Sequence, residues 1–263
     1  MYDTTDHTFV VCAYGESPYL GECVSSLMAQ TAKSTVIMAT STPNDSIRKV
    51  ADDFGLPLYE SGEESGIARD WNHAVSRAKT PLVTIAHQDD TYEPRYAQVM
   101  LEGMSQAQDP LIFFSNYGEL RDGAKVDDNQ LLRIKRMLLR PMKRRRSTSS
   151  SFVKRSILSL GSSICCPSVT LNMDLLPTPP FTSGMKSNLD WDAWERFSRM
   201  DGSFVYSPEI LMHHRIHEES ETSNLIRDNT RTKEDLAMLM RFWPAPVARL
   251  INVVYARGQR SNG

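Results

Sequence analysis

The sequence predicts an α/β fold: an open, mostly parallel sheet with helices on both faces, followed by a smaller, irregular region. Over the first 118 residues, short β-branched apolar runs alternate with apolar stripes of helical period. The connections between them are short, as in sheets built from strand–helix–strand units. Hydrophobic residues make up 40% of the chain and charged residues 24%, which excludes collagen-like and wholly disordered chains.

The elements of this first part follow one another in a regular order. Residues 8–14 (TFVVCAY) form an apolar run typical of a buried strand. Ser17 and Pro18 supply a helix cap and a first-turn proline, and an apolar helical stripe follows from Leu20 to Met28. The remaining expected elements are a strand at 34–40, a helix at 47–54 closed by Gly55, a weaker strand at 56–59, a helix at 67–78, a strand at 81–86, a helix at 94–106 and a strand at 111–115.

The loops that follow these strands should share one edge of the sheet. Ligands of open parallel sheets bind beyond the carboxyl ends of the strands, so residues 13–16, 40–44 and 87–90 are expected to line one rim. The later pattern predicts a strand or buried turn at 164–172, a helix at 188–200, a strand at 203–207 and a helix at 228–242. We therefore divide the chain into residues 1–118, residues 119–220 and a carboxy-terminal helical tail at 221–263.

The charge is nearly balanced overall but unevenly distributed. The net charge is -2, which gives no argument for a nucleic-acid partner. Residues 133–146 (RIKRMLLRPMKRRR) hold eight basic residues and no acidic one, and Met137, Leu138, Leu139 and Met142 lie among them. This pattern fits a helix lying on an anionic membrane surface. It equally fits a solvated basic helix or a mobile loop, which the serine run at 147–151 would continue.

The sequence features that report on location predict a cytoplasmic protein. No apolar run approaches the ~18–20 residues needed to span a bilayer. The amino terminus lacks the basic-then-apolar order of a signal peptide. The four cysteines include the adjacent pair 165–166 and no CxxC motif, which favours a reduced chain.

Two groups of carboxylates could carry chemistry. Asp89 and Asp90 follow the strand at 81–86, and adjacent carboxylates at a strand end suit a divalent cation that bridges to phosphates. A turn that caps the next helix explains the same pair. Asp190, at the start of the expected helix at 188–200, is a candidate general base, with a plain helix-capping role as the alternative.

Two further features involve basic side chains. Arg69 lies in the first turn of the helix opened by Gly66, where it could approach an anionic ligand or simply lie on the surface. His213 and His217 are four residues apart, as in helical zinc sites. They follow a strand and lack the HExxH glutamate, so we do not expect zinc there.

Four segments in this order resemble family 2 glycosyltransferases of the GT-A fold: FVVCAYGESPYLGECVSSLMAQT, GIARDWNHAVSRAKTPLVTIAHQDD, NLDWDAWERF and HHRIHEESET. The resemblance runs from about residue 8 to residue 224. It implies a nucleotide-sugar-binding half at 1–118, an acceptor-side half at 119–220 and the helical tail at 221–263.

The resemblance also implies roles for single residues. Asp190 would be the catalytic base, and Asp90 and His217 would bind a divalent metal, Mn²⁺ or Mg²⁺. The donor site would consist of Ala13, Tyr14, Glu16, Ser41, Arg69, Asn72, Asp89 and Arg215. The sequence departs from the family pattern at three places. The second strand ends in Thr40-Ser41-Thr42 instead of an aspartate, Leu189 replaces the glutamate before the base, and Gln88 stands where an acidic residue often lies.

The activity implied is inverting, metal-dependent transfer of a sugar from a nucleotide sugar, with a UDP-sugar as the expected donor. The acceptor would be a hydroxyl of a glycan or lipid-linked glycan, in the synthesis of surface polysaccharide or glycoconjugates at the inner face of the plasma membrane. A catalytically silent relative that binds a nucleotide sugar and serves a partner enzyme is the alternative. The turn AYGESPYL lacks the Gly-rich, basic loop of a nucleotidyltransferase, and no GxGxxG follows the first strand. The oligomeric state stays open.

Overall fold

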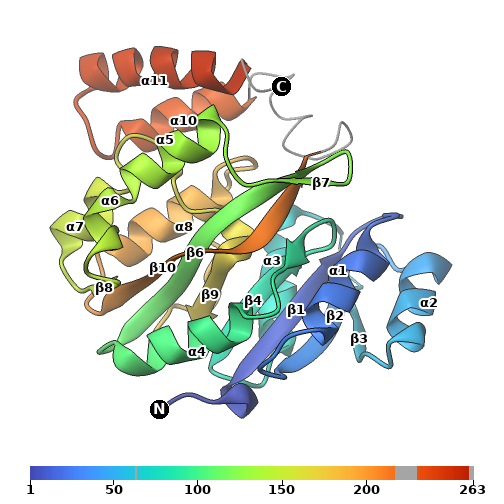
Figure 1. The fold of residues 1–263 in the computed structure, drawn as a ribbon. Coiled ribbons are helices and arrows are strands. Elements are labelled where there is room, and N and C mark those ends of the chain that lie inside the picture. Colours follow the sequence, from blue (N-terminus) through green and yellow to red (C-terminus); the bar gives the residue numbers. More distant parts are fainter. Residues whose placement is uncertain (63, 217–229, 261–263) are drawn as a thin grey trace.

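The protein is an α/β structure built on one mixed sheet (Figure 1). The computed structural model describes residues 1–62, 64–216 and 230–260. The strands are β1 (His7–Ala13), β2 (Thr35–Thr40), β3 (Leu58–Glu60), β4 (Leu82–His87), β5 (Thr91–Tyr92), β6 (Pro110–Arg121), β7 (Ala124–Val126), β8 (Ser147–Thr148), β9 (Val169–Asn172) and β10 (Ser203–Ile216). The helices are α1 (Leu20–Met28), α2 (Asp45–Asp53), α3 (Ile67–Arg77), α4 (Tyr96–Gln106), α5 (Gln130–Leu138), α6 (Arg140–Lys143), α7 (Ser151–Ser156), α8 (Leu189–Ser198), α10 (Thr230–Leu239) and α11 (Ala245–Arg260).

The strand order confirms the predicted open, mostly parallel architecture of the first half. The main path of the sheet is β3-β2-β1-β4-β9-β6-β10-β5, with β7 paired to β6 and β8 paired to β10. β1 to β4 run parallel to one another, and β6 runs parallel to β10. β9 lies between β4 and β6 and is antiparallel to both. The buried segment expected at 164–172 therefore joins the two parallel halves of the sheet.

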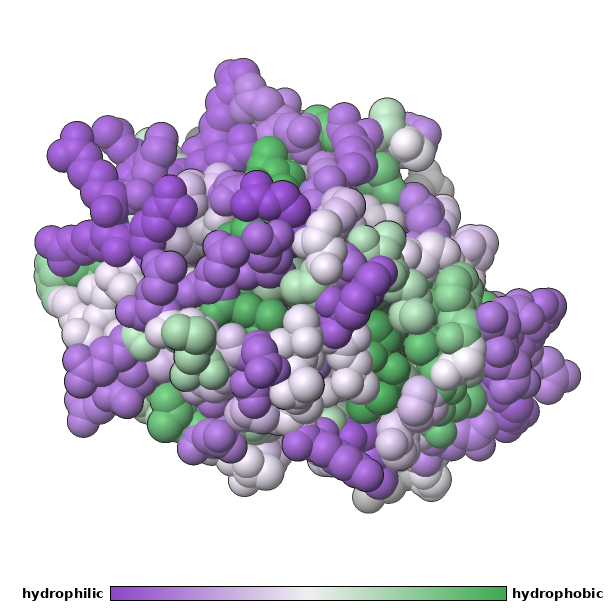
Figure 2. All heavy atoms as spheres, turned by 60° about the horizontal axis from the view of Figure 1, so that its bottom comes forward, coloured by the Kyte–Doolittle hydropathy of each residue, from purple (hydrophilic) through white to green (hydrophobic). Residues whose placement is uncertain are grey.

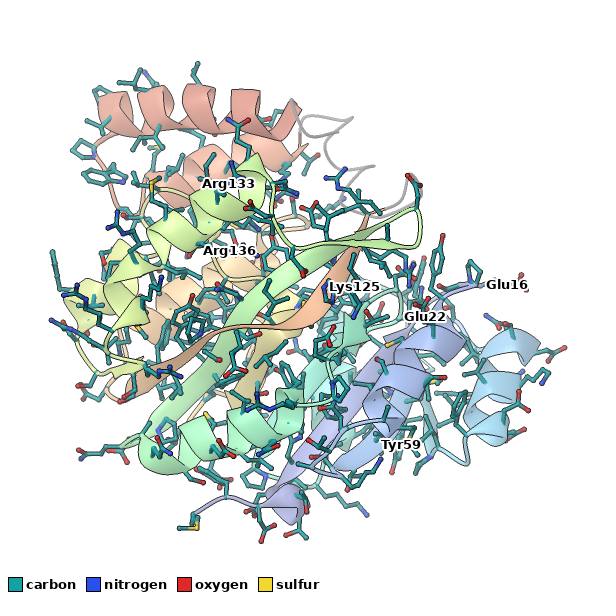
Figure 3. The ribbon with its side chains drawn as sticks, viewed as in Figure 1. Glu16, Glu22, Tyr59, Lys125, Arg133 and Arg136 are labelled. Carbon is teal, nitrogen blue, oxygen red and sulfur yellow. The ribbon has the colours of Figure 1, made fainter. Side chains whose placement is uncertain are left out.

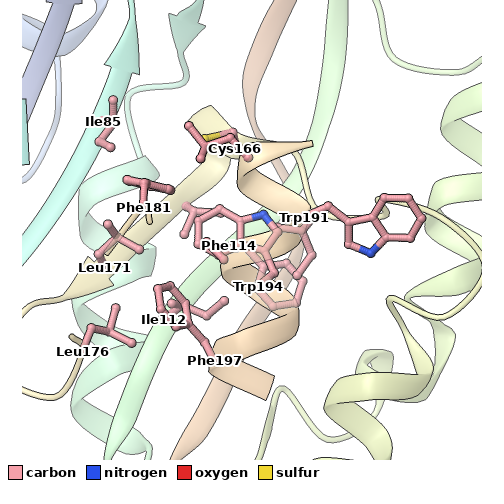
Figure 4. Packing of buried hydrophobic residues seen from close by; sticks show 14 of the residues in the cluster. Ile85, Ile112, Phe114, Cys166, Leu171, Leu176, Phe181, Trp191, Trp194 and Phe197 are labelled. Atoms are coloured by element: carbon pink, nitrogen blue, oxygen red, sulfur yellow. The ribbon is translucent and has the colours of Figure 1, made fainter. Parts of the chain in front are cut away.

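The sheet is buried on both faces, which follows from the alternation of side chains along its strands. Phe9 and Val11 of β1 pack with α1, α2 and α4, whereas Val10 between them packs on the opposite face. That second face carries α3, α8, α10 and part of α11, and its cluster contains the large side chains of Trp191 and Trp194 (Figure 4). Because both faces of the sheet are covered, successive side chains of a strand are buried, and the strands are continuous apolar runs in the sequence.

Two strands are much longer than the apolar runs predict. β6 extends to Arg121 and β10 to Ile216, beyond the runs at 111–115 and 203–207. The extensions contain buried polar residues such as Asn116 and Glu119, so they lack the apolar pattern of a strand. They remain strands because β6 and β10 pair along their length, with register shifts near 207–213. The predicted first helix also begins later, at Leu20, with Tyr19 at its amino-terminal cap.

The basic segment 133–146 forms two short helices, α5 and α6, instead of one continuous amphipathic helix. Leu139 and Met142 point into the core, with 3% and 0% of their surface exposed. The serine run at 147–151 forms β8 and the start of α7, not a loop. Within the part of the chain that the structure describes, every helix is too short or too polar to cross a membrane. Figure 2 shows one face of the molecule, where hydrophilic side chains gather at both lateral edges and apolar ones lie between them.

Candidate active site

A cleft of about 1200 Å³ opens at the carboxyl ends of β1, β2 and β4, where the sequence predicts a binding rim. One side is formed by the loops after these strands and by the start of α3. The other side is formed by residues 162–167 and 186–190 and by side chains of α5 and α10. Of the predicted site residues, the cleft brings together Ala13, Tyr14, Glu16, Ser41, Asp89, Asp90, Asp190 and Arg215.

The turn after β1 is held rigidly by the neighbouring loops. Gly15 adopts a positive φ of 59°, and its amide donates to Thr42 Oγ1 at 2.7 Å. Gln88 clamps Tyr14 from the other side: its Oε1 accepts from the Tyr14 amide and its Nε2 donates to the Tyr14 carbonyl, both at 2.9 Å. Gln88 thus fixes a turn that lines the cleft. In the sequence, Gln88 is recognisable only as a departure from the family pattern, which often has an acidic residue at this position.

Asp90 is one of two deeply buried carboxylates of the cleft, with 1% of its surface exposed, as for Glu119. Its Oδ1 accepts from the Arg215 amide at 2.9 Å and lies 3.0 Å from His214 Nδ1. Its Oδ2 is buried and has no hydrogen-bond partner among the described residues. Burial opposes ionisation of Asp90, but the charge and hydrogen bond of His214 outweigh it. The pKa of Asp90 therefore lies below its ordinary value.

Arg215 ties β10 to the loop after β4 and to α1. Its Nε donates to the Asp89 carbonyl at 2.8 Å, and its guanidinium pairs with Glu22 at 2.5 Å. The same guanidinium lies 4.1 Å from the centroid of the Tyr19 ring. Asp89 accepts in turn from Ser17 Oγ at 2.6 Å. Glu16 and Glu22 lie near the carboxyl end of β1 in Figure 3, so this side of the cleft is acidic.

The two histidines of β10 point to opposite faces of the sheet, as neighbouring strand residues must. His214 faces Asp90, whereas His213 Nε2 lies 2.8 Å from Asp127. His213 therefore faces away from Asp90 and the cleft. His217, the second predicted metal ligand, lies outside the described residues.

The donor set at Asp90 fits a divalent cation that takes part of its coordination from the substrate. The unpartnered Oδ2 of Asp90 borders the cleft, and a hard cation is the natural partner of an ionised carboxylate oxygen. No group of three or more His, Cys, Asp or Glu side chains within the described part of the chain could hold a metal ion by itself. The fit therefore rests on one buried carboxylate, with phosphate oxygens as the complementary ligands.

Asp190 lines the opposite side of the cleft, in the first turn of α8. Burial raises the pKa of the Asp190 carboxyl above its ordinary value of 3.8. The Trp191 amide, which donates to Asp190 Oδ1 at 2.7 Å, and the charge of Arg231 offset only part of this effect. α8 is anchored by the buried Trp191, whose indole Nε1 donates to the Leu158 carbonyl at 3.1 Å. A half-buried carboxylate with a raised pKa on a fixed helix suits general-base chemistry.

Two predicted donor-binding residues do not line the cleft. The Arg69 guanidinium turns back to the Ser65 carbonyl at 3.0 Å and is half exposed. The Asn72 amide group is engaged with the backbone of Phe181, donating to its carbonyl at 2.7 Å and accepting from its amide at 3.1 Å. The geometry therefore gives Asn72 a positioning role for the loop before α8, in place of the predicted direct contact with the donor.

Sequence reasoning missed four residues that the cleft brings together with the predicted ones. They are Gln88, Lys135, His214 and Arg231. Gln88 and His214 are adjacent in the sequence to the predicted residues Asp89 and Arg215, and this adjacency could have identified them as site residues. Lys135 belongs to the basic segment 133–146, which was interpreted only as a surface segment. No sequence motif around Arg231 indicates a role in a site.

The chain was compared with protein families and with known proteins. Residues 8–162 match the sequence pattern of glycosyl transferase family 2. A comparison with curated proteins found no match. Many solved structures share the fold.

Three of these solved structures serve as examples. TarS residues 1–349 of S. aureus has 11% identity and a TM-score of 0.62, over 94% of this chain and 69% of that one. The mannosyltransferase PcManGT of Pyrobaculum calidifontis, in complex with GDP-Man and Mn²⁺, has 14% identity and a TM-score of 0.59, over 97% and 70%. Glucosyl-3-phosphoglycerate synthase of Mycobacterium tuberculosis, with Mn²⁺ and UDP-glucose, has 13% identity and a TM-score of 0.56, over 89% and 79%.

Proposed function

This glycosyltransferase belongs to glycosyl transferase family 2, and we propose that it transfers a sugar with inversion from a nucleotide-sugar donor, expected to be a UDP-sugar, to a hydroxyl group. The acceptor we propose is a glycan or lipid-linked glycan used in surface polysaccharide or glycoconjugate synthesis. One observation supports the proposal above all: the candidate base Asp190 and the carboxylate Asp90 line the same cleft at the carboxyl edge of the sheet. Structures of the same fold hold GDP-Man or UDP-glucose, each with Mn²⁺.

We assign donor binding to the β1–β4 side of the cleft. The turn at Ala13, Tyr14 and Glu16 would hold the base and ribose, with Ser41 beside it. Asp89 and Arg215 adjoin the place where the diphosphate would lie. Arg69 and Asn72 would act on this site through the loops they hold, since neither lines the cleft.

We propose that a divalent cation, Mn²⁺ or Mg²⁺, is held at Asp90, with His217 as the second predicted ligand. When bound, such an ion supplies positive charge against the departing diphosphate. The chain's own contribution is a buried, preorganised carboxylate whose Oδ1 is already fixed by Arg215 and His214. Its Oδ2 accepts no hydrogen bond from the described residues, with His87 Nδ1 4.0 Å away, and would be open to a cation.

Asp190 is the residue that we propose takes the proton from the acceptor hydroxyl. Its carboxylate lies across the cleft from the donor side, so the acceptor oxygen would attack the anomeric carbon on the face opposite the diphosphate. One base and one displacement invert the anomeric configuration. The protein contributes orientation as well as charge, because both groups stand on elements fixed by the core.

A thermal-shift panel of UDP, GDP, dTDP and CDP, each with and without Mn²⁺, tests the donor and metal assignments together. A nucleotide at 100 times its dissociation constant stabilises the fold by about 2.7 kcal/mol. We expect one nucleotide to stabilise the wild type in a Mn²⁺-dependent manner, and Asp90→Asn to lose that dependence. Asp45→Asn is the matched control, because Asp45 is fully exposed on α2. Equal stabilisation with and without Mn²⁺ would overturn the metal assignment.

Donor turnover separates this function from the alternative, a catalytically silent nucleotide-sugar-binding relative. Such a relative would still respond in the thermal-shift panel. It would not release nucleoside diphosphate from the donor, either by transfer or by slow hydrolysis to free sugar. Retention of both Asp90 and Asp190 supports the enzyme.

We also propose that the basic segment 133–146 contacts an anionic membrane surface, placing the enzyme at the inner face of the plasma membrane. Lys143, Arg144, Arg145 and Arg146 are exposed, and residues 129–173 contain no acidic side chain. Exposed apolar side chains lie in the same stretch of the chain, with Met137 at 55% and Phe152, in α7, at 82%. Cationic and exposed apolar groups together are what binding to an anionic lipid surface requires.

A further inference from the structure

The two sides of the cleft carry opposite charge. The β1–β4 side is lined by the carboxylates of Glu16, Asp70, Asp89 and Asp90, and its Arg215 is already paired with Glu22. The side that holds Asp190 is lined by three cations: Lys135, Lys186 and Arg231. The proposed metal ion accounts for the acidic side. The cations beside Asp190 lie on the other side of the cleft from the place proposed for the diphosphate.

Lys135 reaches the cleft from α5 and is half-buried. Its Nζ lies 5.1 Å from the centroid of the Tyr117 ring, and it makes no ion pair among the described residues. Its charge lowers the pKa of both Asp190 and His214, so the ammonium lies within electrostatic reach of both sides of the site. Arg133, on the same helix, instead points outward and pairs with Asp128.

Arg231 and Lys186 approach the same place from two elements that are bonded together. Glu234, one turn along α10 from Arg231, accepts from the backbone amides of residues 186 to 188. This contact sets Arg231 beside the segment that leads into Asp190. The Nε of Arg231 is buried and lacks a hydrogen-bond partner within the described ranges.

The acidic side chains near these cations are already bound. Glu119, which lines the cleft, accepts from Arg121 at 2.7 Å and from Asn129 at 2.8 Å. Glu234 is bound to backbone amides, and Asp235 accepts from the Asn188 side chain at 2.8 Å. None of the three cations forms an ion pair with a carboxylate among the described residues, so each can bind an anionic group of a ligand.

Resting on the proposed function, we infer that the acceptor carries an anionic group, a phosphate or a carboxylate, which Lys135, Arg231 and Lys186 bind next to the hydroxyl that faces Asp190. Charge-assisted hydrogen bonds of this kind are stronger than hydrogen bonds between neutral groups. A neutral acceptor would leave the three cations without an anion. The cleft would then discriminate against it by about tenfold or more.

Lys135 and Arg231 also lower the pKa of Asp190, and the test must separate that effect from acceptor recognition. Removing a cation alters the base equally for every acceptor. It alters the preference for an anionic over a neutral acceptor only if the cation touches the anionic group. The ratio of kcat/KM for two matched acceptors therefore reports recognition alone.

Transfer is measured as release of nucleoside diphosphate from the donor identified in the panel. The acceptors form two matched pairs: glycerol 3-phosphate with glycerol, and methyl glucuronide with methyl glucoside. The same pairs are tested for thermal stabilisation of the nucleotide-loaded protein, which does not require transfer. The proteins are wild type, Lys135→Gln, Arg231→Gln and Arg133→Gln. Arg133→Gln is the matched control, because it removes a cation from α5 outside the cleft.

We expect the wild type to prefer one anionic member by about tenfold, and Lys135→Gln and Arg231→Gln to lose most of that preference through acceptor KM. The anionic acceptor that is preferred, the phosphate or the carboxylate, identifies the class of anionic group that the cleft binds. Arg133→Gln should keep the wild-type ratio. No preference in either readout, or equal losses for anionic and neutral members, would overturn the inference. Donor turnover measured in parallel shows whether the proposed function stands independently.

Discussion

The two adjacent aspartates of the cleft differ in what their oxygens already bind. Asp89 accepts from Ser17, whereas both donors on Asp90, the Arg215 amide and His214, bind its Oδ1. Asp90 Oδ2 accepts no hydrogen bond from the described residues, and His87 Nδ1 lies 4.0 Å from it. An unpaired buried carboxylate oxygen costs free energy unless an ion or ligand binds it. At the scale of single residues, this asymmetry assigns the cation to Asp90 in preference to Asp89.

Asp190→Asn tests the base at the same scale. We expect transfer to fall by about 10²–10⁴ while nucleotide binding is retained, because the amide cannot accept the proton. Burial raises the pKa of Asp190, and only its ionised form is a base. Wild-type kcat/KM should therefore fall as the pH drops through a value above 3.8, the ordinary pKa of an aspartate. Near wild-type transfer by Asp190→Asn would sink the assignment.

Among the elements, α5 has two faces with different tasks. Asn129 caps it by accepting from the Leu132 amide, which fixes where the helix begins and which side chains face inward. Lys135 then faces the cleft, whereas Arg133 and Met137 face outward. α6 follows with exposed basic residues around the buried Met142. The same basic run thus supplies a cleft residue and a surface.

Vesicle co-sedimentation tests that surface. We expect the protein to bind phosphatidylcholine vesicles only when they contain an anionic phospholipid, and to be released at high salt. Replacing Lys143, Arg144 and Arg145 with Gln should weaken binding by about a hundredfold, since each cation contributes about 1 kcal/mol.

The matched control for this triple variant replaces Lys33, Lys49 and Lys79 with Gln. These three lysines are exposed in the first half of the chain, so the change in net charge is the same. Binding that does not depend on anionic lipid, or equal losses in both triple variants, would reject the membrane contact.

The whole molecule is a sheet whose two parallel parts are joined by the antiparallel β9. The donor side of the cleft belongs to the β1–β4 part, and the side holding Asp190 belongs to helices that pack on the same sheet. Figure 1 shows α5, α10 and α11 at one end of the molecule and α2 at the other. Because the two sides of the cleft come from different parts of the fold, the site forms only when the whole sheet and its helices are folded.

Buried His7 links the stability of the whole fold to pH. Its ring nitrogens bond Ser34 Oγ at 2.9 Å and Thr84 Oγ1 at 2.8 Å, and burial lowers its pKa from 6.5 to about 3. Below pH 6.5 the unfolded chain binds a proton that the folded chain excludes. Stability that is complete above pH 6.5 is therefore lost as the pH falls towards 3, by up to about 1.4 kcal/mol per unit.

Urea unfolding of wild type and His7→Gln between pH 7.5 and pH 4.5 measures this effect. Gln cannot titrate, so the difference in the free energy of unfolding between the two proteins should shrink as the pH falls. Parallel curves for the two proteins across this range would show that His7 does not titrate on unfolding.

The fold of the first half followed from the sequence because its strands and helices are set by neighbours in the chain. β1, β2 and β4 are short apolar runs whose period is visible locally, and a sheet covered on both faces requires such runs. The ends of β6 and β10 were missed because they are polar and are held as strands by each other. Loop residues at the strand ends were predicted from the rule that parallel strands end at one edge.

The sequence by itself determined the fold class, the edge that holds the site, and the presence of Asp90 and Asp190 in it. Tertiary structure alone decided which of their oxygens are occupied and which cations face them. His214 reaches Asp90 across 124 positions, and Arg215 reaches Glu22 across 193. The physical reason is that periodicity depends on neighbours in the chain. Desolvation and charge depend on neighbours in space, which the folded chain brings together from distant positions.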